Sequence, residues 1–391
     1  MSDLHIRKDF LPYGYHSIDD EEIAAMTEVL KSGWITGGKE VQNFEDDFKK
    51  FVNSKYAIAC SNGTTALHLT MMAIGIKPND EVITTPLTFA ASSNCVLYQG
   101  GTPVFSDINE KTLEIDPNLI AEKITKNTKA IITVDYAGLP SPLEELKKIC
   151  HENDLFLFED AAHSVGATYK KQKVGSIADL TTFSFHPVKQ ITTGEGGMVT
   201  TNSDELASKI AMLRNHGIDK SGAQRFGSNA NWYYEMKMLG NNYRITDFQC
   251  ALGRVQLKKL PSFIERRKEI ANKYKTILSD SNIILPPESE NSSHSWHIYP
   301  IQINKNVSDD NLRNEIFSYL RSVNIGVNVH YIPVYLHPYY QETFNYLPNS
   351  FPITEKVFKR ILTLPMFPKM TDLDVDYVTD HLKYVLNKLH I

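Results

Sequence analysis

Hydrophobic residues follow two different spacings along the chain. Near the N-terminus, Ile23, Met26, Val29 and Leu30 recur every three or four positions, which is the spacing of a helix that buries one side. From residue 60 to about residue 201, short apolar runs alternate with amphipathic stretches. The runs predict strands at residues 81–85, 103–106, 130–134, 155–158, 182–185 and 198–201. Strands that alternate with helices indicate an α/β fold, in which a mostly parallel sheet carries helices on both faces.

The pattern changes beyond residue 201. Helices are predicted at residues 203–214, 247–257 and 262–278, the last two separated by Pro261. Residues 215–242 show no clear period but contain Trp232-Tyr233-Tyr234, which argues for a functional loop rather than disorder. Strands at 296–303 and 325–330 and helices at 309–322, 354–362 and 373–389 follow. We therefore expect a large domain at residues 1–260 and a smaller α+β domain at residues 261–391.

Composition narrows the classes of partner. The 391 residues carry a net charge of −5 with no long run of one sign, so neither nucleic acid nor an anionic membrane is expected as a partner. No stretch of 18 apolar residues and no signal peptide is found, which predicts neither a membrane span nor export. The four cysteines are scattered, as is typical of the cytoplasm, and no histidine or cysteine spacing suggests a metal site. No GxGxxG after a strand, no Walker loop and no GxSxG elbow is present.

Two residues at strand ends indicate a specific cofactor chemistry. Asp160 comes directly after an apolar run, and Lys189 follows the next predicted strand. Ligands of parallel sheets bind beyond the carboxyl ends of the strands. Pyridoxal phosphate (PLP) needs this pair, because a Lys amine attaches to its aldehyde and a carboxylate keeps its pyridine nitrogen protonated. Taken singly, however, each residue is better explained as a surface Lys or a helix-capping Asp, because both residue types are mostly exposed.

Four further features bear on the same hypothesis. Gly63 and Thr64 open an apolar helix, whose N-terminus can bind phosphate, although an ordinary capped helix would look alike. Ser184 lies five residues before Lys189 and offers a hydroxyl to the phosphate. Phe89 follows a strand and could stack on a flat ring or simply pack in the core. His163, three residues after Asp160, could reach a cofactor oxygen or be structural.

Taken in order, these motifs resemble the DegT-type sugar-nucleotide aminotransferases, which are PLP enzymes of the aspartate-aminotransferase fold (fold type I). The motifs are Ser61-Asn62-Gly63-Thr64, Thr85-Pro86-Leu87-Thr88-Phe89, Glu159-Asp160-Ala161-Ala162-His163, Ser184-Phe185-His186-Pro187-Val188-Lys189 and Gly240-Asn241-Asn242-Tyr243-Arg244. The resemblance covers nearly the whole chain. The ordered set is specific to the family, although each motif alone is not.

The resemblance implies a role for each matching residue. Lys189 would carry the cofactor and move the proton, Asp160 would pair with the pyridine nitrogen, and His163 would contact the O3′ side of the ring. Phe89 would stack on the ring, and Gly63, Thr64 and Ser184 would hold the phosphate. These enzymes are homodimers with shared active sites, so Asn242, or the adjacent Asn241, would reach the partner's phosphate. Substrate contacts would come from Tyr13, Gly33, Trp34, Ile35, Thr36, Asn328, Val329, His330 and Tyr331.

The resemblance also implies a reaction. The motifs are most similar to those of the branch of the family that serves pseudaminic acid synthesis. In that branch, L-glutamate gives its amine to C4 of a UDP-linked 4-keto-6-deoxy-N-acetylhexose, which yields UDP-4-amino-4,6-dideoxy-N-acetyl-L-altrosamine. Bacillosamine-type and perosamine-type ketosugars are alternative substrates. A PLP-dependent sugar dehydratase, which would carry His in place of Lys189, and a non-catalytic regulator are further alternatives, and the intact Lys189 argues against both.

Overall fold

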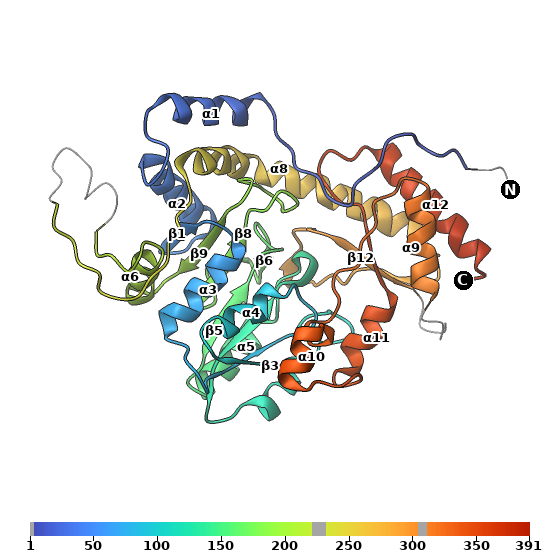
Figure 1. The fold of residues 1–391 in the computed structure, drawn as a ribbon. Helices are drawn as coiled ribbons and strands as arrows, with labels where there is room; N and C mark the ends of the chain where they lie inside the picture. The colour runs from blue at the N-terminus through green and yellow to red at the C-terminus, as the bar shows by residue number, and fades with distance from the viewer. Residues whose placement is uncertain (1–3, 221–231, 304–310) are drawn as a thin grey trace.

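A seven-stranded sheet forms the centre of the protein. The computed structural model describes residues 4–220, 232–303 and 311–391. The strands lie in the order β1-β9-β8-β5-β4-β2-β3 (Figure 1). Their bounds are Tyr56–Cys60 (β1), Glu81–Thr84 (β2), Thr102–Phe105 (β3), Thr128–Val134 (β4), Phe156–Asp160 (β5), Leu180–Ser184 (β8) and Gly197–Thr201 (β9). β9 is antiparallel to both of its neighbours and the other pairs are parallel, which confirms the mostly parallel sheet.

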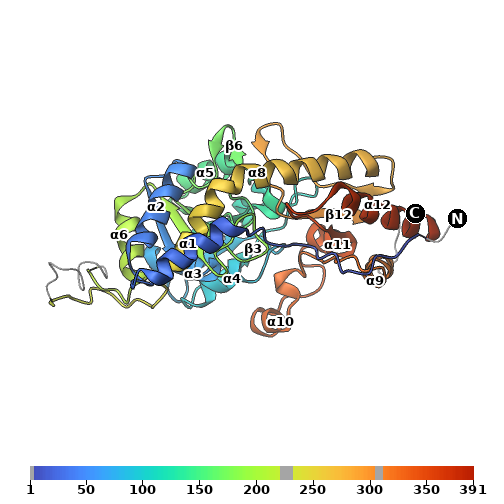
Figure 2. The same cartoon turned by 90° about the horizontal axis from the view of Figure 1, so that it is seen from above.

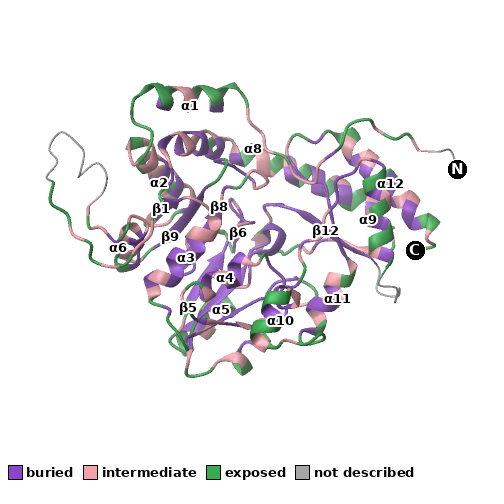
Figure 3. Cartoon of the chain, in the orientation of Figure 1, coloured by how far each residue is buried: buried purple, intermediate pink, exposed green. Residues whose placement is uncertain are grey.

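Helices cover both faces of the sheet, because successive side chains of a strand point to opposite faces. Phe158 packs in a core with α3, α4 and α6, whereas the preceding residue, Leu157, packs against α5 on the other face. Figure 3 shows the strands buried between these layers and α1 with much of its surface exposed. The helices of this part are α1 (Asp20–Lys31), α2 (Lys39–Val52), α3 (Gly63–Ile74), α4 (Ala91–Leu97), α5 (Leu143–Glu152) and α6 (Asp204–Leu213).

Strand β1 was not expected from the sequence. Tyr56–Cys60 contains two alanines and one β-branched residue, which gives it little of the composition typical of a strand. It forms because it pairs along its whole length with β9, a neighbour about 140 positions later in the chain. In α1, Val29 is buried, but Ile23 and Leu30 are each 56% exposed, so the predicted apolar side is only partly covered.

One long helix replaces the two that Pro261 was expected to separate. α8 (Asp247–Leu278) continues through Pro261. A proline inside a helix costs about 3 kcal/mol. Contacts hold the helix on both sides of Pro261: Lys259 pairs with Asp19 and Glu22 of the α1 region, and Arg266 pairs with Asp372 at the start of α12. Figure 2 shows α8 running from α2 to the C-terminal helices.

The C-terminal part combines small sheets with helices. Its elements are β10 (Ile283–Ile284), β11 (Ser292–Ser293), β12 (Tyr299–Ile303), α9 (Leu312–Ser322), α10 (Pro338–Phe344), α11 (Pro352–Arg360), β13 (Ile361–Leu364) and α12 (Asp372–Lys388). The strand expected at 325–330 is wrong: this segment makes only isolated bridges, from Ile325 to Leu11 and from Asn328 to Thr363. β12 pairs instead with β10 and with β13, and part of β13 was expected to be helical. β11 pairs with β6 (Thr168–Tyr169), which also pairs with β7 (Gln172–Lys173).

Two apolar cores favour the division into two domains, which we retain as a proposal. Leu260 packs with α2 and the sheet, whereas Ile270 packs with residues of α9, β12 and α12. The expected boundary at residue 260 therefore lies within α8, where the helix passes from one core to the other. No helix in the described ranges is long and apolar enough to cross a membrane.

Candidate active site

A cavity of about 660 Å³ lies beyond the carboxyl ends of β5 and β8. It collects most of the side chains that the sequence identified, from segments far apart in the chain. Those that line it are Tyr13, Gly63, Thr64, Phe89, Asp160, His163, Ser184, Lys189, Asn328, Val329, His330 and Tyr331. The cavity thus brings the expected cofactor residues together with a large part of the expected substrate residues.

Asp160 is the last residue of β5 and points to the face covered by α4. Its carboxylate accepts a hydrogen bond of 2.6 Å from the Ser92 hydroxyl and one of 3.2 Å from the Ala162 backbone amide. Burial raises the pKa of Asp160, and the Ser92 and Ala162 hydrogen bonds and the Lys189 charge oppose this rise. Both hydrogen-bond donors are neutral, so the buried carboxylate is suited to receive a cationic ring nitrogen.

Lys189 lies in a turn after β8, where its backbone amide donates to the His186 carbonyl at 2.9 Å. Its Nζ is 3.5 Å from Nε2 of His297. Burial lowers the pKa of Lys189 to about 8, and the Asp160 carboxylate partly opposes the effect. Near neutral pH the amine therefore exists in both protonation states, as an attacking and proton-transferring group requires.

His163 lies between Lys189 and the C-terminal part of the chain. Its Nε2 is 3.0 Å from the Tyr331 hydroxyl, and its Nδ1 is buried without a hydrogen-bond partner. Burial, with the neighbouring Lys189 charge, lowers the pKa of His163 well below its usual value. A neutral ring with one unsatisfied nitrogen fits the expected contact with a cofactor oxygen. Phe89 lines the same cavity, with its ring centroid 6.0 Å from that of Tyr331.

The N-terminus of α3 faces the end of β8. Asn62 caps the helix by accepting a hydrogen bond of 2.8 Å from the Thr65 amide. A Cβ on Gly63 would lie 2.9 Å from Cβ of Ser184, so a side chain larger than glycine's would push these two segments apart. The free amides of the helix start, the Thr64 hydroxyl and the Ser184 hydroxyl thus meet at one end of the cavity, which is an arrangement suited to a phosphate group.

These groups fit PLP at each of its polar parts. Asp160 suits the ring nitrogen, Lys189 the aldehyde, and His163 the ring oxygen. The helix start at Gly63, together with Ser184, suits the phosphate. The residues present in the cavity are therefore those that would hold the cofactor expected from the sequence.

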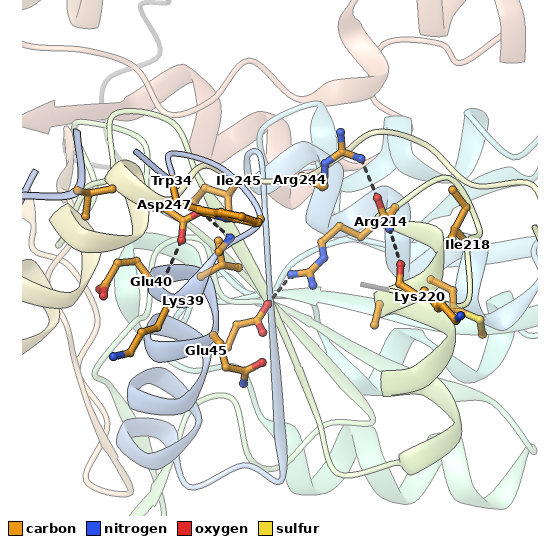
Figure 4. A pocket seen from close by; sticks show the side chains of 18 of the residues that line it. Trp34, Lys39, Glu40, Glu45, Arg214, Ile218, Lys220, Arg244, Ile245 and Asp247 are labelled. Atoms are coloured by element: carbon orange, nitrogen blue, oxygen red, sulfur yellow. Dashed lines mark hydrogen bonds and ion pairs between the residues drawn. The ribbon is translucent and has the colours of Figure 1, made fainter. Parts of the chain in front are cut away.

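Five expected site residues do not line this cavity: Gly33, Trp34, Ile35, Thr36 and Asn242. Trp34 lines a second cavity of about 1040 Å³, which Figure 4 shows with Trp34 lying beside Asp247. The Asp247 carboxylate accepts from the Gly38 and Glu40 amides and so fixes the segment after Trp34. Asn242 is exposed. Within one chain, therefore, these residues lie apart from Lys189.

Two residues at the site were missed by the sequence reasoning. Ser92 lies in α4 and looks like one of several hydroxyls in a small helix, with no signal that connects it to Asp160, 68 positions away. His297 lies just before β12, between Trp296 and Ile298, and is 108 positions from Lys189. A histidine between two apolar residues is typical of a structural residue, so only the folded chain identifies its neighbour.

Known proteins are similar along the whole chain. Residues 16–383 match the model of the DegT/DnrJ/EryC1/StrS aminotransferase family. SpsC, a spore coat polysaccharide biosynthesis protein of Bacillus subtilis, is 43% identical over 382 residues, which cover 97% of this chain and 98% of that protein. PseC of Helicobacter pylori, an aminotransferase involved in the biosynthesis of pseudoaminic acid, superposes with a TM-score of 0.90 at 32% identity, covering 97% of this chain and all of PseC.

A further relative has been solved with forms of the cofactor. Spr1654 of Streptococcus pneumoniae, assigned as a sugar aminotransferase, has been solved in PLP and PMP forms. Its PMP form superposes with a TM-score of 0.92 at 31% identity, covering 97% of this chain and 100% of that chain. Because the family model spans most of the sequence and the cavity holds the residues that PLP requires, the chain belongs to the DegT/DnrJ/EryC1/StrS aminotransferase family and is a PLP-dependent sugar aminotransferase.

Proposed function

We propose that the enzyme moves the amine of L-glutamate to C4 of a UDP-linked 4-keto-6-deoxy-N-acetylhexose and forms UDP-4-amino-4,6-dideoxy-N-acetyl-L-altrosamine. The observation that carries the proposal is that one cavity is lined both by Lys189 and by Tyr13 and residues 328–331, the segments expected to contact the substrate. The name of PseC, which refers to pseudoaminic acid biosynthesis, supports this choice of substrate. SpsC has the higher identity, 43%, and its name refers to spore coat polysaccharide, which favours a different ketosugar as the alternative.

The reaction consists of two amine transfers, from glutamate to the cofactor and from the cofactor to C4 of the sugar, and both take place beside Lys189. When bound, PLP supplies an aldehyde that takes up the amine and a ring that accepts electrons. Asp160 would hold a positive charge at the ring nitrogen, since its carboxylate has only neutral hydrogen-bond donors. Lys189, with its pKa lowered to about 8, would take the proton from the glutamate carbon and later deliver one to C4 of the sugar. 2-Oxoglutarate leaves after the first transfer and the aminosugar after the second.

The remaining cofactor roles follow from the positions of the side chains. His163 would contact the ring oxygen, and Phe89 would stack on the ring. Gly63, Thr64 and Ser184 would bind the phosphate. Tyr13, Asn328, Val329, His330 and Tyr331, which line the same cavity, would contact the sugar nucleotide.

We propose that the active enzyme is a homodimer, working in the cytoplasm, in which each subunit completes the other's site. Several apolar side chains support an interface, because they are exposed in the single chain: Ile35, Trp232, Tyr233, Tyr234, Met236 and Leu239. Asn242 is exposed, whereas the Asn241 amide contacts Met72 of its own chain at 3.6 Å. Asn242 is thus the one suited to reach a partner's phosphate. Gly33, Trp34, Ile35 and Thr36 would contact the partner's substrate for the same reason.

The substrate can be tested directly. Each UDP- and GDP-linked 4-ketosugar is incubated with the enzyme and glutamate, 2-oxoglutarate is quantified, and the C4 configuration of the product is assigned by NMR. We expect amination of the UDP-linked 4-keto-6-deoxy-N-acetylhexose with the L-altro configuration. Faster turnover of a bacillosamine-type or perosamine-type ketosugar would replace the proposed substrate by that sugar.

The cofactor role of Lys189 has a separate test. Protein purified with PLP should be yellow, and glutamate should bleach the band. The variant Lys189→Ala should lose turnover while its circular dichroism spectrum stays unchanged. Turnover that survives in this variant would contradict the role of Lys189.

A further inference from the structure

His297 lies behind Lys189 rather than in the cavity. Its Nε2 is 3.5 Å from the Lys189 Nζ, yet His297 does not line the cavity that holds the substrate residues. Its Nδ1 is buried without a hydrogen-bond partner, an arrangement that normally costs stability. The imidazole Nε2 lies next to the Lys189 amine, which provides its one side-chain hydrogen-bond contact in the described part of the chain, and the imidazole ring also lies 4.3 Å from the ring of His163.

Backbone hydrogen bonds attach the segment that contains His297 to residues 137–138, which follow β4 of the central sheet. The Ser295 amide donates to the Gly138 carbonyl at 3.0 Å, and the His297 amide donates to the Ala137 carbonyl at 2.9 Å. Gly138 has a φ of +104°, and a Cβ there would lie 2.6 Å from the Ser295 hydroxyl. This close approach brings the segment before β12 next to the loop that follows β4.

A buried arginine fixes the same segment from the other side. Arg267 of α8 is completely buried, and its Nη1 donates to the carbonyls of Trp296, His297 and Met366, each at 3.0 Å. All three acceptors are neutral backbone oxygens. Burying a guanidinium without a carboxylate is unfavourable, so its presence here is explained by the geometry that it imposes on residues 296–297.

Gln190 connects this segment to Lys189 itself. Its side-chain amide donates to the Ser295 hydroxyl at 2.8 Å and also to the His163 carbonyl. The Ser295 hydroxyl donates to the same His163 carbonyl at 2.8 Å. The residue after Lys189 is thereby tied to the residue two positions before His297, so the distance between the amine and the imidazole is set by several independent bonds.

We propose that His297 is a positioning residue that accepts a hydrogen bond from the Lys189 amine at Nε2 and holds this amine toward the cavity, with Arg267 and Gln190 fixing the imidazole in place. The inference rests on the proposed function only in that Lys189 is the reacting amine. It assigns to the C-terminal part of the chain a direct effect on the protonation of that amine.

The charges around Lys189 determine the direction of the effect. Asp160, His163, His297 and His330 are the titratable groups whose charges interact with Lys189. Burial lowers the pKa of all three histidines below the usual range, so near neutral pH they are uncharged. A neutral imidazole that accepts from the ammonium form stabilises that form. Removing the acceptor should therefore lower the pKa of Lys189 further.

The test measures the protonation of Lys189 in PLP-free protein. The protein is reacted with an amine reagent across pH 5–10, and labelling of the peptide that contains Lys189 is quantified by mass spectrometry. In His297→Phe we expect the apparent pKa of Lys189 to fall by about one unit, a tenfold change in its acid dissociation constant. His297→Gln keeps a side-chain amide at the position of Nε2 and should restore the wild-type value.

Two further variants keep the test decisive. His297→Asn places its amide at the position of Nδ1, which is too short to reach Lys189, so this variant should behave like His297→Phe. If the Phe variant does not fold, the Gln and Asn variants are compared with each other. His68→Phe is the matched control, since this buried ring contacts Tyr243 and Gln99 instead. An unchanged pKa in both His297→Phe and His297→Asn, or an equal shift in His68→Phe, would overturn the inference.

The outcome is separable from that of the proposed function. Labelling needs neither substrate nor cofactor, so failure of every 4-ketosugar would refute the substrate while leaving the Lys189 shift intact. Conversely, normal turnover with an unshifted pKa would leave the aminotransferase reaction standing and refute the role of His297. In the PLP-loaded enzyme, His297→Phe should lower kcat for the glutamate half-reaction more than it changes KM.

Discussion

The hydrogen bond from Ser92 to Asp160 offers the sharpest test of how the cavity prepares the cofactor site. The variant Ser92→Ala removes a hydroxyl that donates to the Asp160 carboxylate at 2.6 Å. Ser92 is 1% exposed, so water cannot easily replace the lost donor. The Thr88 hydroxyl, 2.8 Å from that of Ser92, would remain in place but loses its partner.

The magnitude follows from the charge of the acceptor. Burial raises the pKa of Asp160, and Ser92 provides the largest opposing contribution. A hydrogen bond to a charged group contributes about 1.5–3 kcal/mol, and 1.36 kcal/mol corresponds to roughly one pKa unit. Because the bond favours the ionised carboxylate, its loss should raise the pKa of Asp160 by about one to two units.

The binding of PLP reports this change. The cofactor requires an ionised Asp160, so the association constant of PLP with PLP-free protein should fall as pH drops through the pKa of that group. Titrations followed by absorbance, at half-unit steps of pH, give the association constant as a function of pH. Its fall at low pH, the acidic limb, should lie about one to two pH units higher in Ser92→Ala than in the wild type. Titration of the PLP phosphate is common to both proteins and cancels in the comparison.

Ser93 supplies the matched control. Its side chain is also buried, but its hydroxyl contacts the Ala90 carbonyl and the Tyr340 hydroxyl rather than Asp160. Ser93→Ala should leave the acidic limb where it is in the wild type. If Ser92→Ala and Ser93→Ala shift the limb equally, or if neither shifts it, the reasoning about Asp160 is refuted.

Three further predictions concern the cofactor site and its support. In PLP-free protein, burial lowers the pKa of Lys189 from 10.5 to about 8, so between these pH values the unfolded chain binds more protons than the folded one and stability rises with pH. Lys189→Met should remove this dependence on pH and raise the melting temperature at pH 7. Thermal denaturation across pH 6–10.5 measures both effects. Gly63→Ala places a Cβ 2.9 Å from Ser184 and should weaken PLP binding about tenfold, measured by titration, whereas unchanged affinity would contradict the close packing. Arg214→Met leaves the Glu45 carboxylate without its cation and should lower the free energy of unfolding by roughly 3 kcal/mol, which urea denaturation would detect. The double variant with Glu45→Gln should recover part of this loss.

Local patterns in the sequence predicted most of the sheet and the place of Lys189 and Asp160. Most strands of the central sheet are short apolar runs, and their alternation with helices favours a mostly parallel arrangement. Lys189 and Asp160 stand next to such strands, so their place at the carboxyl edge follows from the chain itself. The helix start at Gly63 was recognisable because helix N-termini have a local signature.

Contacts between distant segments decided the rest. α8 continues through Pro261 because α1 and α12 hold its two halves, and β1 is a strand because β9 lies beside it. Neither partner can be read from the residues concerned. The same reason explains why the expected substrate residues do not all meet in one cavity: Tyr13 lines the cavity of Lys189, whereas Trp34 lies beside Asp247 in the second cavity.

The sequence by itself predicted which residues do the chemistry, because a Lys and an Asp at neighbouring strand ends stand among the ordered motifs of the family. Only the tertiary structure decided how those residues are tuned. Ser92 and His297 lie 68 and 108 positions from the groups that they contact, and burial in the folded chain sets the pKa of Lys189 at about 8. Hydrogen bonding and desolvation depend on what surrounds an atom in space, and that surrounding exists only once the two parts of the chain have packed together.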